Sequence, residues 1–324
     1  MQLSPEQFHT LFDRAAQPVL LVQDGVITQC SSRAEGLIAP GSPIRELLPP
    51  DAVLQELIAA APTVLPLRLR TGYVTAQVQP LEGALLLFLP VGDDEELRSA
   101  QDMCRRKIAD KHFAAGVSIM DPNNTYIDPR VKIGSGTVIL PGTILRGRTV
   151  IGKNCTIGPN AMIRDCTVGD ETEVNASQLN ESTVGAHTTV GPFAYVRPNS
   201  KIGDHVKVGD FVEIKNSVIG NGTKISHLTY VGDSDCGERI NFGCGTVTTN
   251  YDGFKKFRCT IGDDAFIGCN TNLIAPVTVG NGSYIAAGST ITDEVPADSL
   301  AIARERQVNK PGWAEQWRAA HEKK

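Results

Sequence analysis

Two cationic residues in the middle of the chain have a spacing that a repeating fold could use to bring them together around an anion. Arg197 and Lys215 are 18 residues apart, and each directly follows an aliphatic residue, Val196 or Ile214. Arg forms charge-assisted paired hydrogen bonds with phosphate oxygens, so a phosphate site is one interpretation. A pair of solvated surface cations fits the spacing equally well, and the spacing alone does not decide between them.

A histidine and a carboxylate also occupy equivalent positions relative to the aliphatic residues. His227 and Asp210 each stand two positions after an aliphatic residue, and Glu213 and Tyr230 are spaced alike. A carboxylate beside a histidine orients the ring and raises its basicity. An imidazole with a pKa near ~6.5 suits removal of a proton from an amine at neutral pH. A lone histidine is more often structural or exposed, so the residues by themselves leave its role open.

A second histidine pair suggests a metal site only weakly. His187 and His205 are also 18 residues apart. Metal sites of this kind need further ligands, and no carboxylate constellation near these histidines completes the geometry. We therefore predict two exposed corner residues and no metal.

Aliphatic residues recur every six positions in the sequence, and this period indicates which fold positions these side chains. Aliphatic residues recur in three runs: Ile127, Ile133, Ile139, Leu145, Ile151, Ile157 and Ile163; Val184, Val190, Val196, Ile202, Val208 and Ile214; and Ile261, Ile267, Leu273, Val279, Ile285 and Ile291. Neither a helix nor an isolated strand gives this period. Hexapeptide repeats give a parallel β-helix in which three hexads close one coil. We predict a mainly β protein with a left-handed parallel β-helix.

The period also predicts where a pocket must be built. Residues about 18 apart lie on one face of neighbouring coils, about 4.8 Å apart. The rhythm breaks at residues 241–260, which we interpret as a loop projecting from the prism, a usual place for function. A bare prism surface has few concave sites, so a loop and a neighbouring subunit are expected to wall the pocket.

Composition limits the class of protein. The 324 residues carry a formal net charge of −5, which argues against a nucleic-acid-binding body. The eight cysteines form no CxxC pair, so a zinc site is not expected. The N-terminus has no basic region followed by an apolar core, and no apolar run is long enough to span a membrane. A soluble cytoplasmic protein is the resulting expectation.

The ends of the chain predict additional elements. Residues 94–114 read as an amphipathic linking helix. Residues 1–93 read as a small α/β domain, with helices at 5–16 and 51–61, a hairpin at 19–30 and strands at 64–70, 73–80 and 84–90. This order resembles a PAS-type sensor domain. We place the β-helix domain at 115–304 and a tail with a short helix at 305–324.

Long motifs carry a resemblance to a known family. They are GPFAYVRP, GDFVEIKNS, SHLTYVGD, NFGCGTVTTNYDGFKKF, IGCNTNLIAPVTVG, IAAGSTITDEVP and AIARERQVNK. In these motifs the chain resembles the acetyltransferase half of the bifunctional N-acetylglucosamine-1-phosphate uridylyltransferase/glucosamine-1-phosphate N-acetyltransferase family. The match covers about two-thirds of the chain.

The resemblance implies roles that spacing leaves open. It makes His227 the general base for the glucosamine amine, with Glu213 in support. It assigns the sugar phosphate to Arg197, Lys215, Tyr230 and Lys256, and contact with the sugar or acetyl region of the substrates to Asn241. It assigns acetyl-CoA to Cys244, Asn250, Tyr251, Cys269, Ala287 and Arg304. It also implies a homotrimer with sites between subunits, and acetyl transfer that needs no metal.

The chain departs from the family in one large respect. Only about 95 residues precede the linking helix, and they contain no Gly-rich nucleotide loop. We therefore expect no uridylyltransferase activity, no UTP and no Mg²⁺, and a separate uridylyltransferase for the product. A smaller departure is Cys at 244 and 269, where other members carry Ala or Ser.

The expected function is acetyl-CoA-dependent N-acetylation of glucosamine-1-phosphate for UDP-N-acetylglucosamine and cell-envelope synthesis. One alternative is a modified β-helix scaffold or sensor regulated by the N-terminal domain. Another is an acetyltransferase for a different amino-sugar phosphate.

Overall fold

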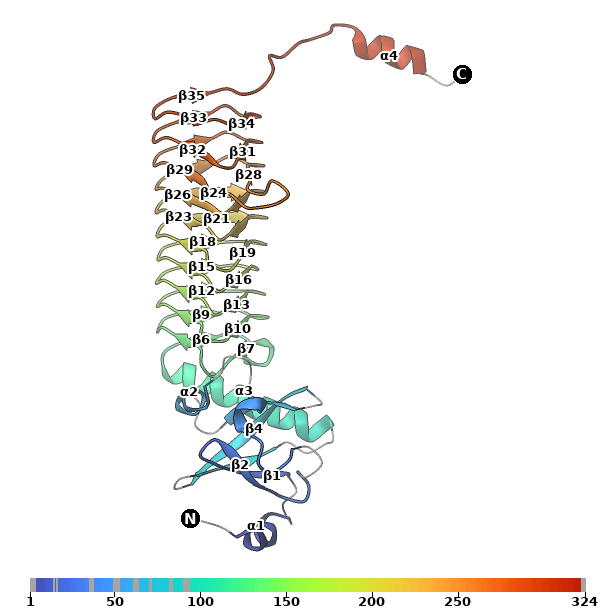
Figure 1. The fold of residues 1–324 in the computed structure, drawn as a ribbon, viewed down its shortest axis with the longest axis vertical. Coiled ribbons are helices and arrows are strands. Elements are labelled where there is room, and N and C mark those ends of the chain that lie inside the picture. The colour runs from blue at the N-terminus through green and yellow to red at the C-terminus, as the bar shows by residue number, and fades with distance from the viewer. Residues whose placement is uncertain are drawn as a thin grey trace.

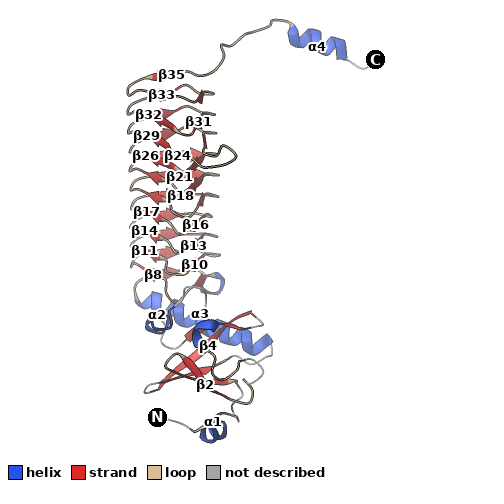
Figure 2. Ribbon diagram, in the orientation of Figure 1, coloured by secondary structure: helices blue, strands red, loops and turns tan. Residues whose placement is uncertain are grey.

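The computed structural model describes residues 4–13, 15, 17–34, 38–48, 53–60, 64–69, 72–81, 84–89 and 94–321. A tall β-helix forms most of the molecule, with a small sheet domain at its N-terminal end and a helical tail at the other end (Figure 1). Figure 2 shows that strands make up the column and that helices gather at its N-terminal base. The predicted fold class, a left-handed parallel β-helix behind a small α/β region, is confirmed.

Three parallel sheets form the walls of the prism. The eleven-stranded sheet contains β6 (Ser118–Ile119), β9 (Val138–Ile139), β12 (Thr156–Ile157), β15 (Glu173–Val174), β18 (Thr189–Val190), β21 (Lys207–Asp210), β24 (Lys224–His227), β27 (Asn241–Phe242), β30 (Phe266–Ile267), β33 (Tyr284–Ile285) and β35 (Leu300–Ala301). The ten-stranded sheet contains β7 (Tyr126–Ile127), β10 (Ile144–Arg146), β13 (Met162–Arg164), β16 (Gln178–Asn180), β19 (Tyr195–Val196), β22 (Glu213–Lys215), β25 (Tyr230–Gly232), β28 (Val247–Thr249), β31 (Asn272–Ile274) and β34 (Thr290–Ile291). The nine-stranded sheet contains β8 (Lys132–Ile133), β11 (Val150–Ile151), β14 (Thr167–Val168), β17 (Thr183–Val184), β20 (Lys201–Ile202), β23 (Val218–Ile219), β26 (Ser234–Cys236), β29 (Cys259–Ile261) and β32 (Val277–Val279).

The aliphatic residues of the period fill the prism interior. Leu145, Ile163, Leu179 and Val196 are fully buried, and they stack in register on successive strands of the ten-stranded sheet. Burial of each such side chain contributes roughly 1.5–3 kcal/mol relative to exposure. A strand of only two or three residues is therefore held by its interior side chain and by the coils on either side.

Buried hydroxyl groups join the coils at the corners. Thr137 donates to the carbonyl of Gly152 at 2.8 Å and accepts from the amide of Cys155 at 3.0 Å. Thr188 makes the same pair of contacts with Gly203 and Val206. A buried hydroxyl needs such partners, since an unpaired polar group in the interior costs free energy.

The predicted loop at 241–260 is wrong in extent. Residues 241–249 continue the prism as β27 and β28, with Phe242 and Thr248 at interior positions. Cys236 occupies the interior position of β26. None of these three residues is aliphatic, so the aliphatic period in the sequence does not include them. Only residues 250–258 leave the prism, as the loop that projects beside β28 in Figure 1.

The N-terminal region is a five-stranded antiparallel sheet in the order β2-β1-β5-β4-β3. Its elements are α1 (Pro5–Phe12), β1 (Val19–Gln23), β2 (Val26–Cys30), η1 (Ile44–Leu47), α2 (Leu54–Ala60), β3 (Val64–Leu69), β4 (Gly72–Leu81) and β5 (Ala84–Phe88). Phe8 of α1 packs on one face of the sheet, and Leu57 of α2 packs on the other. The predicted element order is confirmed, while the PAS-type resemblance and the domain boundaries stay predictions. Five predicted element ends, at Ala16, Asp51, Ala61, Arg70 and Pro90, lie outside the described residues.

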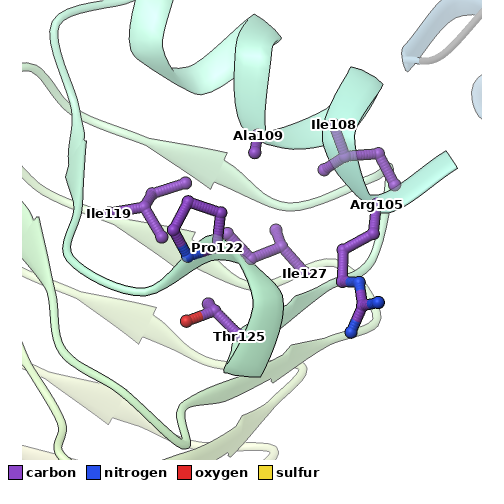
Figure 3. A pocket seen from close by; sticks show the side chains of 7 residues that line it. All are labelled: Arg105, Ile108, Ala109, Ile119, Pro122, Thr125 and Ile127. Atoms are coloured by element: carbon purple, nitrogen blue, oxygen red, sulfur yellow. The ribbon is translucent and has the colours of Figure 1, made fainter. Parts of the chain in front are cut away.

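Helix α3 (Asp94–Ala114) begins and ends where the sequence predicts, and it closes the N-terminal end of the β-helix. Figure 3 shows Ile108 and Ala109 of α3 facing Ile119 and Ile127 of the first coil across a small pocket. The short helix η2 (Pro122–Asn124) lies on the same pocket. At the other end, the predicted tail helix forms as α4 (Trp313–His321). Within the described residues, no helix is both long enough and apolar enough to cross a bilayer.

Candidate active site

The two predicted cations do lie on neighbouring coils of one face. Tyr195 is in register with Glu213, and Val196 with Ile214. Arg197 and Lys215 follow these pairs directly, so both belong to the ten-stranded face. The geometric prediction is confirmed, whereas their role stays a prediction.

Each cation is already paired with a carboxylate. Arg197 Nη1 donates to Glu213 Oε1 at 2.8 Å, and this hydrogen bond raises the pKa of the guanidinium. Lys215 Nζ donates to Asp233 Oδ2 at 2.9 Å. Burial by itself lowers the pKa of Lys215, but the contact with Asp233 outweighs it and the pKa is raised. The repulsion expected between two bare cations is thus offset within the chain.

Asp233, which is not among the residues predicted from the sequence, is the centre of this polar cluster. The side-chain amides of Asn216 and Asn250 each donate to it at 2.5 Å, beside the bond from Lys215. Burial opposes ionisation of Asp233, yet these donors keep its pKa below the ordinary value. The available signal was its spacing, since Asp233 stands 18 residues after Lys215.

The projecting loop adds a third cation. Its ends are held by the hydrogen bond from the Phe257 amide to the Asn250 carbonyl at 2.9 Å, and by a bridge between Tyr251 and Lys256. Arg258 fastens the loop to the prism by an ion pair with Asp235 at 2.6 Å. The loop brings exposed Lys256 next to Lys215, and the proximity of that ammonium lowers the pKa of Lys256.

His227 lies at the corner between the eleven-stranded and ten-stranded faces, in register with Asp210 as predicted. Its Nδ1 is 2.5 Å from Asp210 Oδ1. The hydrogen bond with His227 is the main reason that the pKa of Asp210 is lowered. The carboxylate beside the imidazole is therefore Asp210. Glu213, which the resemblance assigned to this support, contacts Arg197 instead.

Most of the residues predicted to contact acetyl-CoA extend from His227 along one corner of the prism. Ile225 pairs with Phe242, Phe242 with Ile267, and Ile267 with Ile285. Two positions after these interior residues stand His227, Cys244, Cys269 and Ala287, on successive coils. Arg304 lies next to this column, beside the residue after Ala287: its Cδ is 3.6 Å from the point where a Cβ atom on Gly288 would stand.

Two predicted residues lie apart from these groups on a single chain. Asn241 lies on the outer side of the eleven-stranded face, in register with Lys224. The hydroxyl of Tyr251 donates to the Gly253 carbonyl at 2.6 Å, within its own loop. The pockets between α3 and the first coil and beside residues 308–314 are both lined by other residues.

The second histidine pair forms a stack rather than a ligand set. The rings of His187 and His205 are parallel, with centroids 4.8 Å apart, and both residues are exposed at corners with positive φ. Across the described part of the chain, no three metal-ligating side chains of the His, Cys, Asp and Glu types come together.

Comparison with known proteins matches the repeats to two hexapeptide descriptions. Residues 181–216 and 258–293 match "Bacterial transferase hexapeptide (six repeats)". Residues 148–176 match "Hexapeptide repeat of succinyl-transferase". Both matches lie on the β-helix.

Curated relatives are much more similar in sequence. The chain is 54% identical over 229 residues to the "Bifunctional protein GlmU" of Caldanaerobacter subterraneus subsp. tengcongensis, covering 71% of this chain and 50% of the relative. It is 53% identical over 225 residues to that of a Geobacillus species, covering 69% and 49%. It is 50% identical over 251 residues to that of Clostridium kluyveri, covering 74% and 55%. The chain therefore spans about half the length of these relatives.

Solved structures with a similar course include two UDP-N-acetylglucosamine acyltransferases. That of Campylobacter jejuni is 15% identical with a TM-score of 0.39, covering 58% of this chain and 72% of that one. That of Arabidopsis is 18% identical with a TM-score of 0.41, covering 64% and 76%. The similarity to GlmU, with the hexapeptide matches, confirms the predicted resemblance: over its β-helical part this chain is similar to about half the length of the GlmU relatives and carries hexapeptide repeats of the transferase type.

Proposed function

We propose that the protein is an acetyl-CoA-dependent N-acetyltransferase that acts on glucosamine-1-phosphate. The observation that carries the proposal is the contact of His227 with Asp210 beside a cluster of three cations. The "bifunctional" name belongs to relatives of which this chain spans only about half, so only the acetyl transfer is proposed.

The cation cluster supports binding of a sugar phosphate. Lys215 is paired with the buried carboxylate of Asp233, whose side chain is only 7% exposed, and Lys256 lies close enough to Lys215 and Arg197 for their charges to lower its pKa. An incoming phosphate would take the exposed side of the cluster, while Asp233 keeps Lys215 in place from within. The depressed pKa of Lys256 supports this, because a neighbouring anion would offset the repulsion from Lys215.

The dyad at the corner supports base catalysis. With Nδ1 held by Asp210, the other ring nitrogen of His227 is the one available to a substrate amine. His227 takes a proton as the amine attacks the thioester carbonyl, and the thiolate of CoA leaves. Positioned base catalysis of this kind contributes roughly 10²–10⁴-fold to the rate.

The corner column supports a binding path for acetyl-CoA. Coils are about 4.8 Å apart, so the path from His227 to Ala287 runs about 14 Å along the prism. Cys244 and Cys269 lie between them, and Arg304 stands at the far end, where a phosphate of the coenzyme would meet a guanidinium.

The test is direct. The full chain is incubated with acetyl-CoA and glucosamine-1-phosphate, and the acetylated sugar is read by mass. A His227→Ala variant that keeps its β-sheet circular dichroism should lose at least a hundredfold in turnover. Turnover within tenfold of the wild type would exclude His227 as the base. Acetylation of another amino-sugar phosphate in preference to glucosamine-1-phosphate would favour the alternative substrate.

A further inference from the structure

The eight cysteines divide into two groups by accessibility. All of them lie within the described residues, and none of them forms a disulfide in the structure. Six are buried, while Cys244 is half-buried and Cys269 is exposed. Burial raises the pKa of several buried thiols, for example to about 11 for Cys104 and Cys259. Because the thiolate is the reactive form, these buried cysteines are poor nucleophiles at neutral pH. Accessible thiol chemistry is therefore confined to Cys244 and Cys269.

These two cysteines are neighbours on adjacent coils. Phe242 pairs with Ile267, and each cysteine stands two residues further along its strand. The amide of Asn270 donates to the Cys244 carbonyl at 2.8 Å, so the register continues through the corner. The expected Cα separation is one coil, about 4.8 Å. Disulfides require a Cα separation of roughly 4.4–6.8 Å.

Side chains in this same column reach one another elsewhere in the structure. Asp210 and His227 occupy the two preceding steps and are 2.5 Å apart. At the neighbouring corner position, the rings of Phe193 and Phe211 stack with centroids 5.5 Å apart. Consecutive steps of this corner thus bring side chains into direct contact, and Cys244 and Cys269 are the next two steps.

We propose that Cys244 and Cys269 form a reactive dithiol site that is oxidised by small disulfides of the glutathione type. The more exposed Cys269 attacks as a thiolate, forms a mixed disulfide and releases one small thiolate. Cys244 then attacks the Cys269 sulfur, forms the Cys244–Cys269 disulfide and releases the second small thiolate. The protein dithiol loses two electrons and two protons, and the small disulfide is reduced to two thiols.

The consequence for activity rests on the proposed function. A disulfide between these residues would link two coils at the place where acetyl-CoA is proposed to run, next to His227. It should therefore raise the KM for acetyl-CoA more than the KM for the sugar phosphate. The thiol chemistry itself does not depend on this, so the two claims are tested separately.

The experiment uses the native full chain and glutathione disulfide, with intact-protein mass spectrometry as the readout. The expected product has lost two hydrogen atoms and carries no glutathione, and peptide mapping places the link between residues 244 and 269. Dithiothreitol should reverse it. The Cys269→Ser and Cys244→Ser variants should each stop at a single, stable glutathione adduct. A Cys104→Ala variant should still form the cross-link.

Three results would overturn the proposal: separate glutathione adducts on both cysteines, no reaction at either, or earlier reaction of the buried cysteines. A higher KM for acetyl-CoA after oxidation would show that the dithiol lies in the proposed acetyl-CoA path. A cross-link that forms without any change in either KM would retain the dithiol chemistry and reject its link to the proposed function.

Discussion

At the scale of single residues, the site is a set of charges held by pairing within the chain. The side chain of Lys215 is only 17% exposed and that of its partner Asp233 only 7%, so this ion pair is largely shielded from solvent. Arg197 and Glu213 are each 39% exposed and form a pair that solvent screens more strongly. A phosphate would compete with Glu213 for Arg197 more easily than with Asp233 for Lys215. In the proposed function, Lys215 would therefore position the phosphate and Arg197 would adapt to it.

The carboxylate of Asp210 gives the first prediction. An Asp210→Asn change keeps the shape but removes the carboxylate that holds Nδ1 of His227. We expect kcat to fall at least tenfold while the KM for each substrate changes little, since the amide no longer fixes the tautomer and orientation of the ring. The matched control is Glu171→Gln, which alters the similar surface contact between Glu171 and His187 at 3.3 Å. An unchanged kcat in Asp210→Asn would contradict the positioning role.

The loop lysines give the second prediction. Lys256→Met should raise the KM for glucosamine-1-phosphate roughly tenfold and leave the KM for acetyl-CoA unchanged. Lys255 is the control, because its ammonium lies 4.8 Å from the Phe257 ring centroid and takes no part in the cation cluster. Steady-state kinetics with each substrate varied separately provides the measurement. Equal effects of the two substitutions would mean that Lys256 acts only through the general charge of the loop.

At the scale of elements, the sequence predicts the coils well because one physical constraint repeats. Every interior position must be filled by a side chain that fits the prism, and most are aliphatic, so Val196, Ile214 and their equivalents reveal the period. The prediction failed where another residue type met the same constraint, as at Phe242 and Thr248. It also could not foresee which carboxylate contacts which cation. Residues 18 apart share a face, but the side-chain directions that join Arg197 to Glu213 are set by the folded corner.

Thr248 shows how a polar residue can occupy an interior position, and it gives the third prediction. Its hydroxyl accepts from the Gly232 amide at 2.7 Å and donates to the Gly232 carbonyl at 3.1 Å. Thr248→Val fits the space but leaves that buried amide unpaired, so the free energy of unfolding should fall by about 1–3 kcal/mol. Thr278→Val, on an exposed strand position, should change it by less than about 0.5 kcal/mol. Urea denaturation followed by circular dichroism compares the two, and equal midpoints would show that water satisfies the amide.

The end of α3 gives the fourth prediction. His112 is 3% exposed, and burial followed by the charge of Lys111 lowers its pKa to about 4. The unfolded chain, with an ordinary histidine pKa near ~6.5, binds the proton more tightly. The contribution of neutral His112 to the free energy of unfolding is therefore fully present above pH ~6.5. It is lost as the pH falls toward ~4, and the loss reaches at most about 3 kcal/mol.

A His112→Gln variant removes this titration. Its thermal midpoint should fall less between pH 7 and pH 5 than that of the wild type. His205→Gln, at an exposed corner, should keep the wild-type pH dependence. If His112→Gln and the wild type lose stability in parallel, the proton-linked loss arises elsewhere in the molecule.

At the scale of the whole molecule, one chain presents the proposed contacts on two faces. Lys215 and its neighbours lie on the ten-stranded face, and Asn241 lies on the eleven-stranded face. The corner between these faces carries Phe211 and Leu228, which are 57% and 56% exposed. A small sugar phosphate held by Lys215 would have to bend around these side chains to reach Asn241 of the same chain. A second copy that presents its own Asn241 across the site removes this difficulty, and it agrees with the trimer that the family resemblance implies.

Subunit mixing tests this arrangement. Lys215→Ala and Asn241→Ala variants should each have low activity alone. After they are denatured and refolded together in equal amounts, sites that combine an intact Lys215 with an intact Asn241 from another copy should appear. In a symmetric trimer with random mixing, activity should return to about a quarter of the wild-type value. Because a site built within one chain would always contain one of the two substitutions, activity that stays at the level of the separate variants would place Asn241 and Lys215 in the same subunit's site. The control refolds each variant separately, which should give no gain.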